Sequence, residues 1–128
     1  MGAIKKIETE VCEIWQDEKG WIHTSFKTGS DVEVSHMQEI DDILAKLCGG
    51  KPFKNMVDFR NKHINFDPAA RKYAAKSHIT ELIHSSAIVF NTLPARMVVN
   101  FFLRFDKPSY PVRAFSDMNK AEEWLKKQ

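Results

Sequence analysis

The sequence predicts an α/β fold in which a mainly parallel, five-stranded sheet begins with an antiparallel hairpin. Short apolar runs suited to strands alternate along the chain with longer segments whose apolar residues recur every three or four positions. Two strand-like segments precede the first helical pattern, and no repeat, low-complexity segment or linker divides the 128 residues. We therefore expect a single domain over 1–128 with the element order ββαβαβαβα.

The opening hairpin is predicted from two segments, 6–15 and 21–27, in which side chains alternate in polarity. The charged turn "QDEKG" joins them, and its Gly20 can take a left-handed conformation. One alternation of the first strand carries Ile7, Thr9, Val11, Glu13 and Trp15.

The first helix is predicted over 36–48. Ser35 and Gln38 stand at the spacing of a capping box, so Ser35 is the expected N-cap, and Gly49 or Gly50 closes the helix. The apolar stripe that would pack on the sheet consists of Met37, Ile40, Ile43, Leu44 and Leu47.

A third strand is predicted at 53–59 and a fourth at 85–90, with a helix between them. Asp67 is the expected N-cap of that helix, because Pro68 then occupies the first helical position, which proline favours. The helix is expected to run to about residue 83.

The segment 94–105 allows two interpretations. A third helix is predicted to begin near Leu93, but "MVVNFFLRF" is rich in the β-branched and aromatic residues that favour strands. A fifth strand follows in "PVRAF", and Ser116 is the expected cap of a final helix, "DMNKAEEWLKK".

The composition is that of a soluble globular protein, with 43% hydrophobic and 28% charged residues. The net charge of +2 and the scattered lysines give no basis for expecting a nucleic-acid partner. No segment reaches the roughly 20 apolar residues of a membrane span and the N-terminus has no secretory signal, so no stable membrane anchor is expected. Cys12 and Cys48 form no CxxC pair and are predicted to be reduced thiols of a cytoplasmic protein.

The sequence offers no catalytic set. Asp58 and Arg60 lie two apart on a strand and point to the same side, which favours a structural ion pair over a catalytic couple. The five histidines lack metal-ligand spacing, and there is no Walker loop, no Gly-x-Gly-x-x-Gly run and no Gly-x-Ser-x-Gly elbow. We therefore expect a non-enzymatic protein without a metal or a cofactor.

The element order resembles that of the STAS domain, the SpoIIAA-like fold of anti-sigma-factor antagonists. The runs "GKPFKNMVDFRNKHINFDPAARKYAA", "MVVNFFL" and "RAFSDMNKAEEWL" are similar to a group of small, uncharacterised bacterial STAS-like proteins, which are sometimes grouped with CRAL-TRIO lipid carriers. The resemblance covers nearly the whole chain. It implies a binding or regulatory module.

The chain departs from the antagonist pattern at the start of the second helix. Antagonists carry an Asp-Ser-Ser-Gly type sequence there, and its serine accepts phosphate from a partner kinase. The matching residues here are Asp67-Pro68-Ala69-Ala70, so the cap is kept and the hydroxyl is lost. We predict that this protein is not a serine-switched antagonist.

A candidate anion site is predicted where the third and fourth strands end. Ligands of open α/β sheets gather beyond the carboxyl ends of the strands, and helix N-termini combined with arginines favour an anion. This anion rim consists of Arg60, Asn61, Asn91, Thr92 and Arg96. The alternative is that these residues only cap helices and face solvent.

The segment 94–105 also predicts a contact surface. As a helix, it carries apolar residues over two-thirds of its circumference, more than the stripe of about 100° that packs on a sheet. The excess residues either pack under the loop "DKPSYP", line a ligand cavity or form a two-fold dimer. We expect self-association or binding to another protein, with Val99, Phe102 and Leu103 as contact residues. The alternative is a small carrier or sensor of an anionic or lipid-like ligand.

Overall fold

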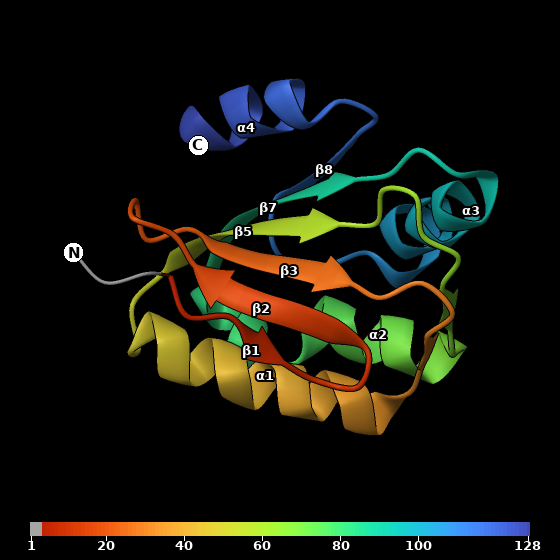
Figure 1. The fold of residues 1–128 in the computed structure, drawn as a ribbon, viewed down its shortest axis with the longest axis horizontal. Coiled ribbons are helices and arrows are strands. Elements are labelled where there is room, and N and C mark those ends of the chain that lie inside the picture. The colour runs from red at the N-terminus through yellow and green to blue at the C-terminus, as the bar shows by residue number, and fades with distance from the viewer. Residues whose placement is uncertain (1–3) are drawn as a thin grey trace.

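The computed structural model describes residues 4–128; the predicted domain 1–128 also includes residues 1–3, which lie outside the described range. Within that range, the centre is a six-stranded sheet in the order β1-β2-β3-β5-β7-β8 (Figure 1). A separate parallel ladder joins β4 (Asp31–Val32) to β6 (Asn65–Phe66). The strands of the main sheet are β1 (Ile7–Glu8), β2 (Cys12–Gln16), β3 (Ile22–Phe26), β5 (Phe53–Asp58), β7 (Ile83–Val89) and β8 (Val112–Phe115).

The main sheet is largely parallel, as the alternation of elements predicts. β1, β2 and β3 form an antiparallel meander, whereas β3, β5, β7 and β8 pair in parallel. Each parallel connection passes through a helix, which is the usual crossover between parallel strands. The α/β prediction is therefore confirmed, with one more strand in the described sheet than the five predicted.

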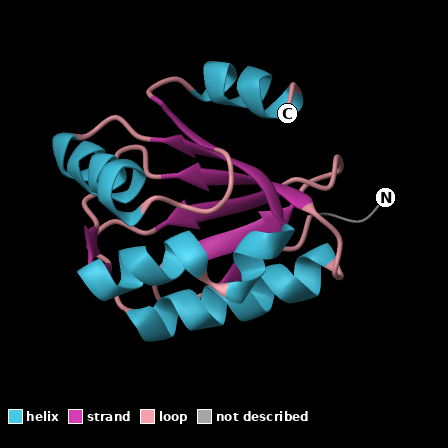
Figure 2. Cartoon of the chain, turned by 180° about the vertical axis from the view of Figure 1, so that it is seen from behind, coloured by secondary structure: helices cyan, strands magenta, loops and turns pink. Residues whose placement is uncertain are grey.

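The α-helices cover the two faces of the sheet unequally (Figure 2). Three helices lie against one face, and the last helix, α4, lies against the other. A 3-10 turn (His78–Leu82) follows α2, and a π-helical turn (Phe102–Asp106) follows α3. Among residues 4–128, no helix is both long and apolar enough to cross a membrane. The helices are α1 (Val34–Cys48), α2 (Pro68–Lys76), α3 (Leu93–Phe101) and α4 (Met118–Lys126).

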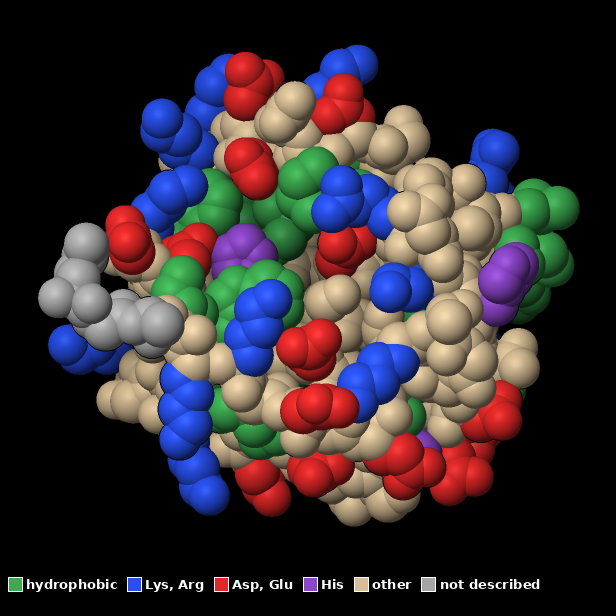
Figure 3. Space-filling view, in the orientation of Figure 1, with side chains coloured by type: hydrophobic (Ala, Val, Ile, Leu, Met, Phe, Trp, Pro, Cys, Tyr) green, Lys and Arg blue, Asp and Glu red, His purple; other side chains and the backbone are tan. Residues whose placement is uncertain are grey.

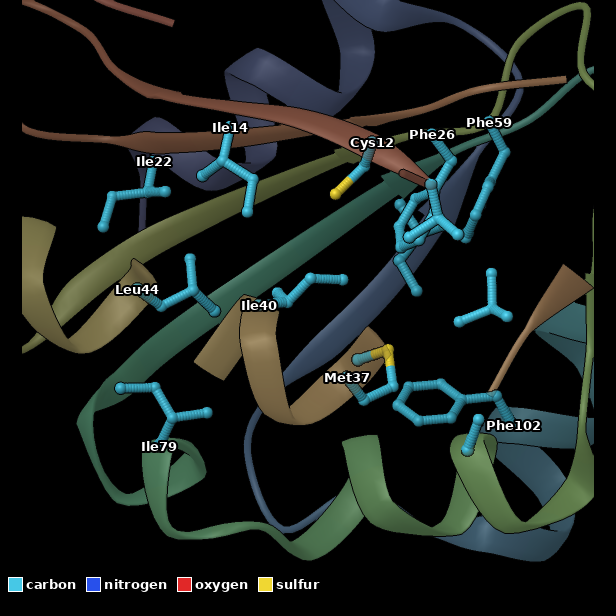
Figure 4. Close-up of a cluster of buried hydrophobic side chains, with 14 of the residues drawn as sticks. Cys12, Ile14, Ile22, Phe26, Met37, Ile40, Leu44, Phe59, Ile79 and Phe102 are labelled. Atoms are coloured by element: carbon cyan, nitrogen blue, oxygen red, sulfur yellow. The ribbon is translucent and has the colours of Figure 1, made fainter. Parts of the chain in front are cut away.

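The main core lies between the sheet and the layer of α1, α2 and α3. Phe26, Phe59 and Phe66 meet at ring-centre distances of 4.9, 5.4 and 5.9 Å. The predicted stripe of α1 points into this core, as Figure 4 shows for Met37, Ile40 and Leu44. A smaller core under α4 contains Trp21, Met56, Ala87, Val89, Ala121 and Leu125.

The segment 6–15 forms two short strands and not the one predicted. The hydroxyl of Thr9 accepts hydrogen bonds from the backbone N–H groups of Val11 and Cys12, at 3.2 and 3.0 Å, and this turn separates β1 from β2. Cys12 and Ile14 are fully buried after the turn, so the predicted alternation does not run continuously through the segment.

Ser35 is not the N-cap of α1, which corrects the first of the predicted caps. The helix begins at Val34, one residue before Ser35, with Glu33 at the cap position. The N–H of Glu33 donates to Nδ1 of His36 at 2.9 Å, and this bond from the cap backbone to the third helical residue fixes the start of the helix.

Asp67 is the N-cap of α2, and its carboxylate accepts a hydrogen bond from the N–H of Ala69 at 3.2 Å. Ser116, in contrast, does not cap α4. That position is taken by Asp117, whose carboxylate accepts from the N–H of Asn119 at 2.8 Å. Both predicted serine caps were therefore wrong, because an acidic residue, two positions before Ser35 and one position after Ser116, occupies the capping position.

Helix α2 ends at Lys76, and not near residue 83 as predicted. Ser77 takes an extended conformation, and a 2.6 Å hydrogen bond from Thr80 Oγ1 to the Ser77 carbonyl stabilises the 3-10 turn that follows. This turn leads directly into β7, which begins at Ile83 instead of residue 85.

The segment 94–105 is helical, so the helix interpretation of its pattern is right and the strand interpretation is wrong. Helix α3 begins at Leu93, where Thr92 Oγ1 accepts a hydrogen bond from the N–H of Ala95 at 3.4 Å. After Phe101 the helix widens into the π turn, which ends at Asp106 with Lys107 as its C-cap at a φ of 47°.

Candidate functional site: the outer face of α3 and the cavity beneath it

The outer face of α3 and its π turn carries an exposed row of apolar side chains. Leu93, Met97, Phe101 and Phe105 follow one another at intervals of four residues and are 69%, 56%, 46% and 68% exposed. Residues at this spacing lie on one side of a helix. Figure 3 shows hydrophobic side chains gathered over α3 at the right edge of the molecule. We call these four residues the outer row.

The contact residues predicted for this helix lie on its inner side. Val99 and Phe102 are 1% and 8% exposed and belong to the main core, and Leu103 is half-buried against that core. Figure 4 shows Phe102 within the layer of buried side chains. The prediction that Val99 and Phe102 form a contact surface is wrong, because these residues, together with Ala95, supply the side of α3 that packs under the sheet.

Polar residues flank the outer row. Arg96, Asn100 and Arg104, which also lie four residues apart, are exposed on α3 and its π turn. In addition, the guanidinium of Arg71 on α2 lies 5.3 Å from the centre of the Phe101 ring. The outer face of α3 is therefore apolar along its length, with positive charge beside it.

Side-chain bonds attach the π turn after α3, and the loop that follows it, to α2. Arg71 Nε donates to Asp106 Oδ2 at 2.8 Å, and the side chain of Asp106 is only 2% exposed. Beyond the π turn, the hydroxyl of Tyr110 donates to the carbonyl of Ala74 at 3.3 Å. Burial raises the pKa of Tyr110, so this hydroxyl keeps its proton and remains a donor.

Three residues of the predicted anion rim are bonded to one another or to their neighbours. The N–H of Asn61 donates to Asn91 Oδ1 at 2.7 Å, and Asn91 Nδ2 donates to Asn61 Oδ1 at 3.0 Å. Thr92 Oγ1 donates to the carbonyl of Lys62 at 3.2 Å. These bonds tie the loop after β5 to the loop after β7, which is a structural role. Binding of an anion at this rim stays a prediction.

The two arginines of the rim have different surroundings. Arg60 is held by Asp58, because its Nε and Nη2 donate to the two carboxylate oxygens at 3.0 and 2.9 Å. This two-point contact raises the pKa of Arg60 and confirms the predicted ion pair. Arg96 lies on the exposed side of α3.

A cavity of about 100 Å³ lies inside the main core, between the sheet and the helical layer. The inner side of α3 forms one of its walls through Val98, Val99 and Phe102. The same helix therefore faces the cavity on one side and presents the outer row on the other. Other apolar side chains on the walls include Phe26, Met37, Ile40, Leu44, Ile79 and Ile88.

A few polar side chains also reach this cavity. Asn55 and Ser86 are paired in register on β5 and β7, and Asn55 Nδ2 donates to Ser86 Oγ at 3.4 Å. Asn55 is 7% exposed, yet its Oδ1 has no hydrogen-bond partner within residues 4–128. Asp41 of α1 lines the cavity as well, and burial is the main reason that its pKa is raised.

The histidines and acidic residues that the structure describes form no cluster of three or more metal-binding side chains. His23 bonds to Asp17 at 2.8 Å and stacks on Trp15 with ring centres 5.1 Å apart. His36 accepts the bond that starts α1. Hydrogen bonds and ring stacking within the fold therefore account for the positions of both histidine side chains.

Sequence patterns did not single out Asn55. Its only signal is an amide in the middle of "FKNMVDF", a strand whose neighbouring inward positions, Phe53 and Val57, are apolar. A buried amide usually has hydrogen-bond partners for all its polar atoms. Asn55 is a candidate site residue because its Oδ1 has none within residues 4–128, and only the structure shows this.

Known proteins resemble this chain in fold. Residues 14–128 match the family model described as "Domain of unknown function (DUF7793)". None of the curated proteins matches the chain. The chain is similar to the crystal structure of an uncharacterised protein of the DUF3478 family, with a SpoIIAA-like fold, from Shewanella loihica PV-4. The two share 14% sequence identity and superpose with a TM-score of 0.57 over 96% of this chain and 92% of that chain.

This likeness shows the fold and confirms the resemblance to an uncharacterised STAS-like, SpoIIAA-like group. The family model covers all elements from the middle of β2 to the last residue, including α3 and the cavity walls. The chain therefore belongs to the family of the domain of unknown function DUF7793.

Proposed function

We propose that this protein is a non-enzymatic binding or regulatory module that acts through protein–protein contacts, with the outer row of α3 as its contact surface and a second copy of the chain as its partner. The exposure of four large apolar side chains in one row carries this proposal. Burying a side chain of this kind contributes about 1.5–3 kcal/mol. Contiguous exposed apolar surface commonly marks an interface.

The size of the outer row fits a two-fold dimer. A large apolar side chain has on the order of 200 Å² of surface, so the exposed fractions of the four residues correspond to roughly 500 Å². A standard interface buries about 800 Å² on each partner. The outer row therefore supplies more than half of that area, and the side chains beside it supply the remainder. A two-fold axis brings the same patch of both copies together.

The polar residues beside the outer row suit the edge of such an interface. Arg96, Asn100 and Arg104 lie where interfaces usually have a polar, solvent-accessible rim. Repulsion between arginines of the two copies is weak there, because salt screens exposed charges over about 8 Å at physiological ionic strength.

The start of α2 supports a module that lacks the serine switch of anti-sigma antagonists. Asp67 caps the helix, and the next three residues, Pro68, Ala69 and Ala70, have no hydroxyl group. We propose that phosphorylation at this position does not control partner binding.

Cysteine cross-linking tests where the two copies meet. Each residue of the outer row is replaced in turn by cysteine, and the protein is oxidised mildly. A residue near a two-fold axis meets its own copy, and a disulfide forms when the two Cα atoms lie within about 7 Å. Lys120→Cys, on the exposed part of α4, is the matched control.

We expect at least one of the four variants to form a covalent dimer on a non-reducing gel, while Lys120→Cys stays monomeric. Cys12 and Cys48 are buried and do not interfere. Equal cross-linking of the control, or none in all four variants, would argue against an interface at the outer row.

A second candidate function is that of a carrier or sensor of a small ligand. The cavity of about 100 Å³ beneath α3 is the observation that favours it. The anionic or lipid-like ligand expected from the sequence belongs to this proposal. Native mass spectrometry of the purified protein tests it, because a retained ligand adds mass that is lost on denaturation.

A further inference from the structure

We infer that the cavity beneath α3 binds a small uncharged molecule that has a hydrocarbon body and one hydroxyl group, and that this hydroxyl bonds to Asn55. The inference rests on the second candidate function, a carrier or sensor of a small ligand, and does not depend on self-association. Three observations support it. The core contains an apolar cavity, the Oδ1 of Asn55 on its wall has no hydrogen-bond partner within residues 4–128, and Arg71, the basic residue of the wall, is already bonded to Asp106.

The cavity sets the size of the ligand. Its volume is about 100 Å³. This volume is less than the dry apolar cavity of about 150 Å³ that binds benzene, and far less than the roughly 300–1,000 Å³ of sites for drug-sized molecules, so a single ring is the upper limit of what it can hold. The occupant is therefore a molecule of few heavy atoms, smaller than a lipid tail.

The Asn55 amide sets the polar group of the ligand. A buried amide oxygen without a hydrogen bond destabilises the folded state, and the Oδ1 of Asn55 is in this position. A hydroxyl donates to that oxygen. Because a hydroxyl also accepts, it satisfies Asn55 equally well if the amide turns its NH₂ group toward the cavity.

The charged side chains on the wall disfavour an anion. Among the described residues that line the cavity, Arg71 is the basic one, and its Nε is bonded to Asp106 at 2.8 Å. Asp41 is the acidic one, and burial raises its pKa, so its surroundings already disfavour a negative charge. A phosphate or carboxylate in this space would meet Asp41, and the cation beside it, Arg71, already has the Asp106 carboxylate as its counterion. An uncharged ligand avoids this.

Phenol is the probe that tests the inference, with benzene as the matched hydrocarbon and benzoate as the matched anion. Each is titrated into the isotope-labelled full chain and followed by the backbone amide signals. We expect phenol to shift the amides around Thr24, Asn55 and Ser86, and benzoate to leave them unchanged. Asn55→Leu keeps a similar side-chain volume but removes the amide. Relative to benzene, phenol should bind this variant about tenfold more weakly than it binds the wild type, as the loss of one hydrogen bond implies.

Two further variants keep the inference falsifiable if Asn55→Leu does not fold. Ala74→Leu places additional carbon atoms in the cavity and should abolish binding of both phenol and benzene. Ser86→Ala removes the group that now accepts the Asn55 amide and should weaken phenol binding more than benzene binding. An unchanged ratio of the phenol and benzene dissociation constants in Ser86→Ala, and in Asn55→Leu where it folds, would overturn the role of Asn55.

The absence of any shift with phenol and benzene would overturn the inference as a whole, and so would tight binding of benzoate. A cavity that holds only water would bind neither phenol nor benzene and would leave all amide signals unshifted. The mass of the protein, measured by light scattering in the same samples, reports separately on self-association. A retained ligand in native mass spectra that is anionic or lipid-like would support a carrier while contradicting the ligand class inferred here.

Discussion

Arg71 and Asp106 join α2 to the π turn through a buried ion pair, in which Arg71 Nε donates to Asp106 Oδ2 at 2.8 Å. The side chain of Arg71 is 16% exposed and that of Asp106 is 2% exposed. The same guanidinium lies 5.3 Å from the ring of Phe101, a member of the outer row. The pair therefore connects the helix that carries the candidate contact surface to the rest of the helical layer.

Removing one partner of this pair should destabilise the protein strongly. Arg71→Ala leaves the Asp106 carboxylate buried without its partner, and we expect the free energy of unfolding to fall by about 3 kcal/mol. Urea unfolding measures this loss. Arg104→Ala, at an exposed position of the same π turn, is the control and should change stability by less than about 0.5 kcal/mol. Equal effects of the two variants would show that the buried pair has no special role.

Asp41 should make stability depend on pH. Burial raises its pKa in the folded state above the ordinary value of 3.8, so the folded state binds the proton more tightly than the unfolded chain does. Its stabilising contribution is present at pH values below 3.8 and is lost as the pH rises through the folded-state pKa. We expect Asp41→Asn to be more stable than the wild type at pH 7, and this advantage to shrink toward pH 3.

Asp42→Asn is the matched control for that measurement, because Asp42 is the exposed neighbour of Asp41. Unfolding curves of both variants and of the wild type are compared between pH 3 and pH 7. A constant difference between Asp41→Asn and the wild type over this range would contradict the assignment.

The Cys12 thiol should be protected from modification in the native protein. Cys12 is fully buried, and burial raises the pKa of its thiol to about 11. Because only the thiolate reacts, its reaction with a disulfide reagent at pH 8 should be more than about a hundredfold slower than in the unfolded chain. The introduced thiol of Lys120→Cys reports the rate for an exposed site. A native Cys12 that reacts as fast as this control would contradict the buried position.

An anion should bind only weakly at the rim formed by the loops after β5 and β7. The helix dipole of α3 favours an anion by about 0.3–1 kcal/mol, and the Asn61 and Asn91 amides already bond to each other. Sulfate titration at constant ionic strength should therefore shift the amides of 60–62 and 91–96 with low affinity. Arg96→Gln should reduce these shifts and Arg113→Gln, exposed on β8, should not. Shifts confined to other regions would sink the prediction.

Much of the fold was predictable because its longer elements show their period in the sequence. The three- and four-residue recurrence of α1 survives as a buried stripe, and the apolar runs of β5 and β7 form interior strands with a neighbour on each side. The β4–β6 ladder has two residues in each strand, which is too short for a period to be read. The turn at Thr9 interrupts an apparently continuous strand through side-chain hydrogen bonds that a polarity pattern does not reveal.

The candidate site was predictable only in part. The excess of apolar residues in 94–105 correctly indicates a helix that the sheet does not fully cover. Which side stays exposed depends on packing: Val99 fits the core closely, whereas Met97 and Phe105 remain outside. Contacts between residues far apart in the sequence cannot be predicted from local periodicity. The missing hydrogen-bond partner of Asn55 Oδ1 could not be predicted for the same reason.

Self-association through the outer row is tested most directly by the mass of the protein in solution, measured by light scattering. We predict a wild-type mass of about twice the 14.8 kDa of one chain, and a monomer for the Met97→Asp/Phe105→Asp double variant. Both positions are exposed, so the variant should keep its circular dichroism spectrum. Asn119→Asp, exposed on α4, should remain dimeric. A wild type that is monomeric at the highest concentration reached, or a dimer that the double variant does not dissociate, would contradict the proposal.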